Sequence, residues 1–340
     1  MRKLLNTLYI TNENVYVSLD GENVVCKQDG KIIFRIPFDN LESIVCFSML
    51  GCSPALMGKC VKDNIALSFV NPYSGKFLAR ACGETRGNIH MRINQIDVFR
   101  QNDIELSRNT IAAKFHNCIA VIKEMIRNKK ELGEDREITN VIKILEEGIE
   151  KILLVEEKDT LMGIEGNCAH HYFNVYGKLF SEHGIGGTFK ARNKRPPLDP
   201  VNAVLSFLYT MITIDYGSAL ETVGIDPYIG YLHSIRSNRQ SLACDMVEES
   251  RCLAEKFVLT MFNLRILGEK DFDTYETGAV LLNDDGRRKV LTKWQEKKKT
   301  TIVHPYLKKK IALGLVPYVQ ANLLTKYLRG EIDEYQCFLL

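Results

Sequence analysis

The chain has 340 residues, 45% of them hydrophobic and 26% charged, and a formal net charge of +3. This composition is that of a globular protein of about two domains, and it excludes a disordered or low-complexity chain. The net charge is too small to name a partner, but basic residues gather in three late segments, at 190–195, 287–299 and 308–310. Segments of this kind are usually solvated, and they also suit a polyanion.

Ten cysteines lie mostly inside apolar runs and form no C-x-x-C pair. This pattern predicts reduced thiols and a cytoplasmic protein. Asn6 interrupts the first apolar run, so we predict no signal peptide. We expect no later run to be long enough to span a bilayer, and we predict no membrane association.

Residues 1–85 contain short runs of β-branched and aromatic residues and are predicted to form a small β-rich domain. Asp20-Gly21 and Asp29-Gly30 are typical of tight hairpin turns. One short helix is expected over 53–63, with Pro54 in its first turn. Strands are expected at 9–10, 14–19, 23–27, 31–36, 41–47, 65–70 and 77–81.

Residues 86–92 are predicted to be a linker, and residues 93–340 an α-helical catalytic domain, because the apolar period becomes helical from this point. Thr160 is expected to cap the helix over 161–180, Ser241 to cap one long helix to about 263, and a charged turn to occupy 283–286. Further helices are expected at 93–126 (two), 138–154, 201–217 and 311–328. The fold class is therefore α+β multidomain, with a small β-rich N-terminal domain followed by a larger all-α catalytic domain.

The segment 230–249 combines one imidazole with two carboxylates. His233 precedes Asp245 by twelve residues and Glu248 by fifteen, and Arg236 and Arg239 lie between them. On a helix Asp245 and Glu248 would occupy neighbouring positions of one face, where with His233 they could bind a divalent ion, while the arginines hold phosphates. The alternative is a solvated acidic helix face preceded by an ordinary histidine.

Glu165 near the start of the 161–180 helix is a further carboxylate, although it could simply complement the helix dipole. Arg192 and Arg195 lie in the loop before the 201–217 helix, in which Asn202 and Ser206 repeat at helical spacing. The arginines could contact DNA or brace the site, and Asn202 and Ser206 could only hold helices together.

Neither a phosphate-binding GK[ST] loop nor a G-x-S-x-G nucleophile motif is present in the sequence. One histidine among several carboxylates favours Mg²⁺ or Mn²⁺ over structural zinc. A hard ion on a basic surface indicates phosphodiester chemistry.

Four segments together resemble a known family along essentially the whole chain. These segments are Leu161-Met162-Gly163-Ile164-Glu165-Gly166, residues 192–207 from Arg192 to Phe207, residues 224–233 from Gly224 to His233, and residues 241–249 from Ser241 to Glu249. The chain resembles the CRISPR-associated spacer-acquisition integrase and endonuclease family, which inserts new spacers into CRISPR arrays. Each segment alone would be weak, and the set is highly specific.

The resemblance implies that Glu165, His233 and Glu248 bind a Mg²⁺ or Mn²⁺ ion, with Asp245 as a neighbouring acid of the catalytic set. It further implies DNA as substrate, a homodimer joined through the β-rich domain, and a small dimeric companion protein of the CRISPR adaptation machinery. Arg192, Arg195, Arg236 and Arg239 are the candidate DNA contacts.

Two functions remain open at this point. The first is a metal-dependent DNA endonuclease and integrase in which a DNA 3′-hydroxyl, or water, attacks a phosphodiester. The second is a non-catalytic DNA-binding scaffold with a structural metal site.

Overall fold

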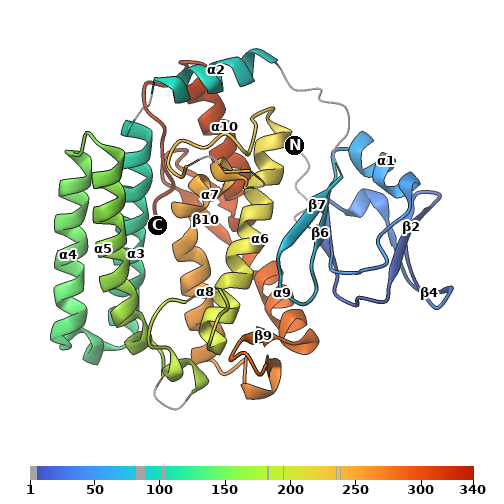
Figure 1. Ribbon diagram of the computed structural model, residues 1–340, viewed down its shortest axis with the longest axis horizontal. Coiled ribbons are helices and arrows are strands. Elements are labelled where there is room, and N and C mark those ends of the chain that lie inside the picture. The colour runs from blue at the N-terminus through green and yellow to red at the C-terminus, as the bar shows by residue number, and fades with distance from the viewer. Residues whose placement is uncertain are drawn as a thin grey trace.

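The computed structural model describes residues 6–81, 89–101, 104–181, 184–193, 195–234, 236–237 and 239–340. Within 6–81, the strands alternate with turns and form two sheets, at the right of Figure 1. The strands are β1 (Thr7–Ile10), β2 (Tyr16–Asp20), β3 (Asn23–Gln28), β4 (Lys31–Pro37), β5 (Ser43–Cys46), β6 (Ala66–Val70) and β7 (Phe77–Arg80).

One sheet has the order β1-β5-β6-β7, in which β1, β5 and β6 are parallel and β7 is antiparallel to β6. The other is the antiparallel β2-β3-β4 meander. Its second turn is the predicted Asp29-Gly30, where both residues have positive φ, 49° and 75°. Such a two-residue turn matches the right-handed twist of the flanking strands.

Helix α1 (Pro54–Lys62) begins where it was predicted, because the Ser53 hydroxyl accepts a hydrogen bond from the Leu56 amide at 3.2 Å. Leu56 and Cys60 face inward. They join a core made entirely from residues 10–67. The β-rich part therefore has a hydrophobic core of its own.

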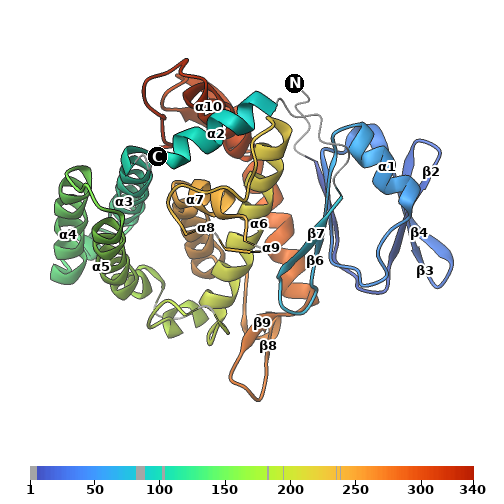
Figure 2. The same cartoon turned by 45° about the horizontal axis from the view of Figure 1, so that its top comes forward.

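The chain from Ile89 onward is mostly helical, so the predicted fold class is confirmed, while the expectation that this part is all-α is wrong in detail. Two short hairpins, β8–β9 and β10–β11, interrupt it. The helices stand beside the β-rich part in Figures 1 and 2. The elements are α2 (Ile89–Arg100), α3 (Ile104–Asn128), α4 (Arg136–Leu153), α5 (Lys158–Tyr176), α6 (Pro200–Thr222), α7 (Ser241–Glu248), α8 (Arg251–Asn263), β8 (Phe272–Thr274), β9 (Val280–Leu282), α9 (Asp284–Lys298), β10 (Thr301–His304), β11 (Lys309–Ala312) and α10 (Val316–Leu328).

Several predicted boundaries are wrong. Helix α5 begins at Lys158, so Thr160 lies in its first turn and is not the cap. Ser241 is the first residue of α7, and Gln240 is the N-cap. The long helix expected from 241 to 263 is two helices, since the chain turns at 249–250. The charged turn at 283–286 is the cap and first turn of α9, where the Asn283 side chain accepts from the Gly286 amide.

The predicted linker at 86–92 overlaps a helix. Positions 86–88 lie outside the described residues, and 89–92 begin α2.

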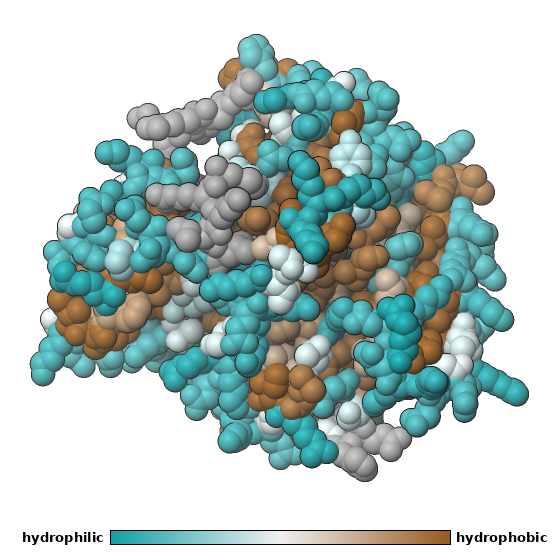
Figure 3. Space-filling model, turned by 180° about the vertical axis from the view of Figure 1, so that it is seen from behind, coloured by the Kyte–Doolittle hydropathy of each residue, from teal (hydrophilic) through white to brown (hydrophobic). Residues whose placement is uncertain are grey.

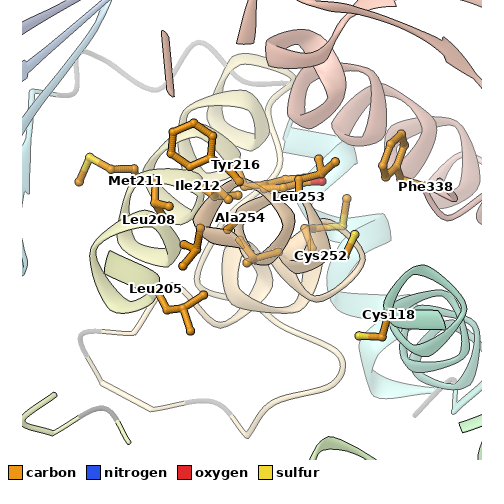
Figure 4. Close-up of a cluster of buried hydrophobic side chains, with 14 of the residues drawn as sticks. Cys118, Leu205, Leu208, Met211, Ile212, Tyr216, Cys252, Leu253, Ala254 and Phe338 are labelled. Atoms are coloured by element: carbon orange, nitrogen blue, oxygen red, sulfur yellow. The ribbon is translucent and has the colours of Figure 1, made fainter. Parts of the chain in front are cut away.

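Helix α6 forms the centre of the helical part and packs against α8. It is 23 residues long and apolar enough to cross a membrane by length and composition, so the expectation that no segment would be long enough is wrong. However, 67% of its apolar window is buried inside the protein, as in the core helix of a globular fold. Figure 4 shows this core, with labelled side chains Leu205, Leu208, Met211 and Ile212 of α6 beside Cys252, Leu253 and Ala254 of α8.

Buried cations join the β-rich part to the helices. Arg80 at the end of β7 donates to the Ile214 carbonyl of α6 at 3.0 Å and forms an ion pair with Glu221 at 2.8 Å. Arg287 of α9 donates to the Pro72 carbonyl in the β6–β7 turn. These contacts fix the β6–β7 hairpin alongside α6, and the candidate site opens between them.

Candidate functional site

Asp245 of α7 is fully buried, and both of its oxygens are occupied. Oδ2 accepts from the amides of Tyr231 and Leu232 at 2.7 and 3.0 Å, and Oδ1 accepts from the His233 amide at 3.0 Å. The His233 ring nitrogen Nδ1 lies 2.6 Å from the same Oδ1. A hydrogen bond from Nδ1 to a carboxylate fixes the tautomer and leaves Nε2 with a lone pair. Asp245 therefore shapes the His233 loop and orients the imidazole.

Gly230 lets this loop approach α7 closely. A Cβ atom at position 230 would lie 2.6 Å from Asp245 Oδ2 and 2.7 Å from Ser241 Cβ. Real Cβ atoms do not approach that near, so a side chain here would push the loop away from the carboxylate that orients His233.

Glu165 of α5 and Glu248 of α7 meet through a lysine. The Lys114 ammonium on α3 forms ion pairs with Glu165 Oε1 and, at 2.8 Å, with Glu248 Oε2. Arg251 forms a second ion pair with Glu248, at 2.6 Å. Burial alone would raise the pKa of Glu248, but Arg251 and Lys114 hold that pKa well below its usual range. Glu248 is therefore a buried, ionised carboxylate.

Lys114 belongs to a polar stripe that the sequence analysis missed. Ser107, Thr110, Lys114 and Asn117 repeat at helical spacing on α3, and all four are buried among its apolar residues. Ser107 and Thr110 contact Tyr231 beside the His233 loop, and Asn117 donates to the Glu249 carbonyl at 2.8 Å. The spacing of four polar residues at i, i+3, i+7 and i+10, on one face of α3, was the signal that could have found them.

Within the described part of the chain, no three His, Cys, Asp or Glu side chains converge closely enough to hold a metal ion as they stand. The Lys114 ammonium lies between the two glutamates and forms ion pairs with both. The donors still fit a hard divalent ion. Glu248 Oε2 is engaged by the Lys114 ammonium, a cation that an ion could replace, and Glu165 and His233 retain 18% and 20% side-chain exposure.

Two arginines enclose Tyr209 of α6 next to this cluster. The guanidinium carbons of Arg251 and Arg192 lie 4.3 and 5.3 Å from the centre of the Tyr209 ring. Arg192 also donates to Asn202 Oδ1 at 2.7 Å and to Ser206 Oγ at 3.1 Å. Arg192, Asn202 and Ser206 thus brace the loop that precedes α6.

A cleft of about 890 Å³ opens beside the cluster, between the β6–β7 turn and helices α6 and α7. His233 and Glu248 lie in its wall. Its basic side chains are Lys76, Arg192, Arg195, Arg239, Arg251 and Arg287. Arg195 is exposed and Arg239 is half-buried, whereas Arg236 is exposed and is not among the residues that line the cleft. The structure therefore brings three of the four candidate arginines to the site and leaves Arg236 outside it.

The family model described as CRISPR associated protein Cas1 matches residues 8–296 of the chain. The chain belongs to this family. CRISPR-associated endonuclease Cas1 2 of Rhodospirillum rubrum is 39% identical over 344 residues, which cover 98% of this chain and 98% of the relative. CRISPR-associated endonuclease Cas1 1 of Chlorobaculum tepidum is 37% identical over 342 residues, or 100% of this chain and 99% of the relative.

Solved structures share the fold. A casposase bound to its integration product has a TM-score of 0.84 at 19% identity, covering 97% of this chain and 92% of that chain. A Cas6-RT-Cas1–Cas2 complex has a TM-score of 0.81 at 19% identity, covering 99% of this chain and 36% of that chain. At such identities the likeness shows the fold alone.

The predicted family and enzyme class are confirmed: the chain is a member of a family of CRISPR-associated endonucleases. Membership of this endonuclease family implies a nuclease that depends on a divalent metal ion.

Proposed function

We propose that the chain is a divalent-metal DNA endonuclease and integrase that inserts spacers into CRISPR arrays, with its catalytic centre at Glu165, His233 and Glu248. The observation that carries this proposal is one cluster: two carboxylates from different helices converge on a single cation, beside an imidazole oriented by Asp245. His233 and Glu248 of this cluster lie in the wall of a basic cleft. The alternative, a DNA-binding scaffold with a structural metal, does not require the metal ligands to be accessible from a cleft.

The residues divide the work by their chemistry. Glu165 and Glu248 would supply hard oxygen ligands, and His233 Nε2 a nitrogen ligand, for Mg²⁺ or Mn²⁺. When bound, the ion neutralises charge on the scissile phosphate and aligns an incoming 3′-hydroxyl or water. Asp245 keeps His233 in the required tautomer, and Arg251 keeps Glu248 ionised. The transesterification exchanges one phosphodiester for another, so it needs no ATP and no covalent protein intermediate.

The cleft is proposed to bind DNA phosphates with little base selectivity, so affinity should fall steeply with salt. We expect Arg239→Ala to weaken binding and to reduce the salt dependence by about one ion, because Arg239 lines the cleft. Arg236→Ala is the matched control from the same loop, and it should change both quantities less. The measurement is fluorescence anisotropy of labelled duplex DNA across a salt series. A flat salt response in the wild type contradicts the phosphate contacts.

We infer a β-rich domain (1–85) and a helical catalytic domain (93–340), supported by the separate core of residues 10–67. The nine described cysteines form no disulfide, which supports a cytoplasmic location. A solved complex named Cas1–Cas2 supports Cas2 as the small dimeric companion.

A homodimer is also proposed. Figure 3 shows apolar surface on the β-rich end of the molecule. In this part of the chain, strand β4 exposes Ile32, Ile33 and Phe34, by 53%, 54% and 46%.

Strand transfer tests the catalytic proposal directly. A donor duplex with free 3′-hydroxyl ends should be joined to a repeat-containing target with Mg²⁺ or Mn²⁺ and without ATP. Donors with 3′-dideoxy or 3′-phosphate ends should fail. Glu165→Gln should abolish joining and cleavage while keeping the fold and most DNA affinity, because glutamine lacks the charged carboxylate that would bind the ion but has nearly the same shape.

Joining of the blocked donors, or a strict need for ATP, would show that the mechanism is wrong. Normal cleavage by Glu165→Gln with Mn²⁺ would show that the site is assigned wrongly. DNA binding without any new strand ends would favour the scaffold.

A further inference from the structure

Lys114 occupies the space in which the two proposed metal-binding carboxylates meet. Its side chain is 8% exposed, and its ammonium reaches both Glu165 and Glu248. The buried ammonium forms ion pairs with two carboxylates, and it satisfies the same oxygens that a divalent ion would use.

The charges within ion-pair reach already balance. Glu165 and Glu248 contribute two negative charges, and Lys114 and Arg251 contribute two positive charges. A divalent ion entering this set without any other change would leave two uncompensated positive charges in a buried place, which is costly. Either the ammonium must leave the carboxylates, or new negative charge must arrive.

We propose that Lys114 is the resident counter-cation of the Glu165–Glu248 pair: it holds the carboxylates in place without metal and gives up at least one of them when a divalent ion binds. The inference rests on the proposed metal site and deepens it, because it makes Lys114 a positioning residue that competes with the ion. The phosphate of a DNA substrate supplies compensating negative charge. Metal binding to the free protein is therefore weak, and DNA strengthens it.

The test compares Mn²⁺ binding, followed by the EPR signal of free Mn²⁺, among variants of the full chain without DNA. Lys114→Met removes the charge and keeps the length of the side chain, so it should tighten Mn²⁺ binding by about tenfold or more. In EDTA the same variant should melt at a lower temperature than the wild type, and Mn²⁺ should raise its melting temperature by more. Lys114→Arg keeps the charge and should not tighten binding.

Lys298→Met is the matched control. Lys298 is also a buried lysine in an ion pair, with Asp215 at 2.9 Å, but it lies on α9 away from the cluster. Its loss should lower stability and leave Mn²⁺ affinity within about twofold of the wild type, since distant sites act independently.

The outcomes separate the two proposals. Equal Mn²⁺ binding by the wild type, Glu165→Gln and Glu248→Gln overturns the metal site itself. If those variants lose Mn²⁺ but a folded Lys114→Met binds it no more tightly than the wild type, only the role of Lys114 falls. Where Lys114→Met does not fold in EDTA, Lys114→Gln replaces it. A neutral variant that stays unfolded with Mn²⁺ also overturns the inference, because the ion is expected to substitute for the ammonium.

Discussion

At the scale of single residues, the contacts of Asp245 give it a role different from that of a ligand. Its two oxygens accept from three consecutive backbone amides and from the imidazole. A carboxylate with every lone pair engaged is a poor additional ligand, but it is well suited to fix a loop and a tautomer. Asp245 and Glu248 share one short helix and yet do different things, because each meets a different neighbouring element.

We therefore expect Asp245→Asn to weaken Mn²⁺ binding by roughly 10–100-fold and to slow strand transfer, because an amide NH₂ would face backbone donors and could not hold His233 in the same way. Titration of free Mn²⁺ and a single-turnover joining assay measure the two effects. Asp226→Asn is the control, since the exposed-side contact of the Asp226 carboxylate is one hydrogen bond accepted from the Tyr228 amide. Unchanged Mn²⁺ affinity in Asp245→Asn would contradict the positioning role.

At the scale of elements, helix α3 fixes the turn at 249–250, which follows Glu248. Asn117 donates to the carbonyls of Glu249 and Phe338 at 2.8 and 2.9 Å and accepts from the Leu340 amide at 2.8 Å. It thus joins α3, the turn that follows Glu248, and the C-terminal segment. Lys114 lies on the same polar stripe of α3. This helix face therefore neutralises the charges of Glu165 and Glu248 and, through Asn117, fixes the backbone that follows Glu248.

Asn117→Ala should cost about 3 kcal/mol of unfolding free energy, because it leaves buried amide and carbonyl groups without partners. Urea denaturation measures the change. The control Asn322→Ala removes an exposed amide that donates only within its own helix, to Tyr318, and should cost about 0.5 kcal/mol or less. Equal losses in the two variants would show that Asn117 does not fasten these segments.

The elements also show what the sequence could predict. The β-rich part was predicted strand by strand, because D-G turns and a proline in the first turn of a helix are local signals. The break between α7 and α8 was missed, since the apolar positions Leu242, Met246, Leu253 and Phe257 keep a helical period across it.

The break between α7 and α8 is caused by residues that are distant in the chain. Buried Glu249, whose pKa burial raises to about 7, accepts hydrogen bonds from Gln320, Tyr335 and the Phe338 amide, which lie 71–89 residues away. Lys114 was missed for a similar reason: the spacing of its polar stripe could have shown which face it occupies, but its partners are distant in the chain, on α5 and α7.

At the scale of the whole molecule, the β-rich part has an exposed edge strand that carries apolar side chains. Strand β4 is an edge of the β2-β3-β4 sheet and is exposed on both of its faces from Lys31 to Arg35. An edge strand with several exposed apolar side chains is a site for pairing with another chain unless something covers it. The proposed catalytic cluster lies in the helical part, so pairing through β4 would leave the cleft open to DNA.

If β4 joins two copies of the chain, Ile33→Lys should convert the dimer to a monomer, because it places a charge on the exposed apolar edge. The melting temperature of the monomer fold should hardly change, since Ile33 contributes little to either core. Multi-angle light scattering at micromolar concentration measures the mass. Leu154→Lys is the control: Leu154 is 81% exposed at the end of α4, outside the β-rich part, and its substitution should leave the dimer intact. A monomeric wild type would contradict the dimer itself, and a dimer that survives Ile33→Lys would place the contact outside β4.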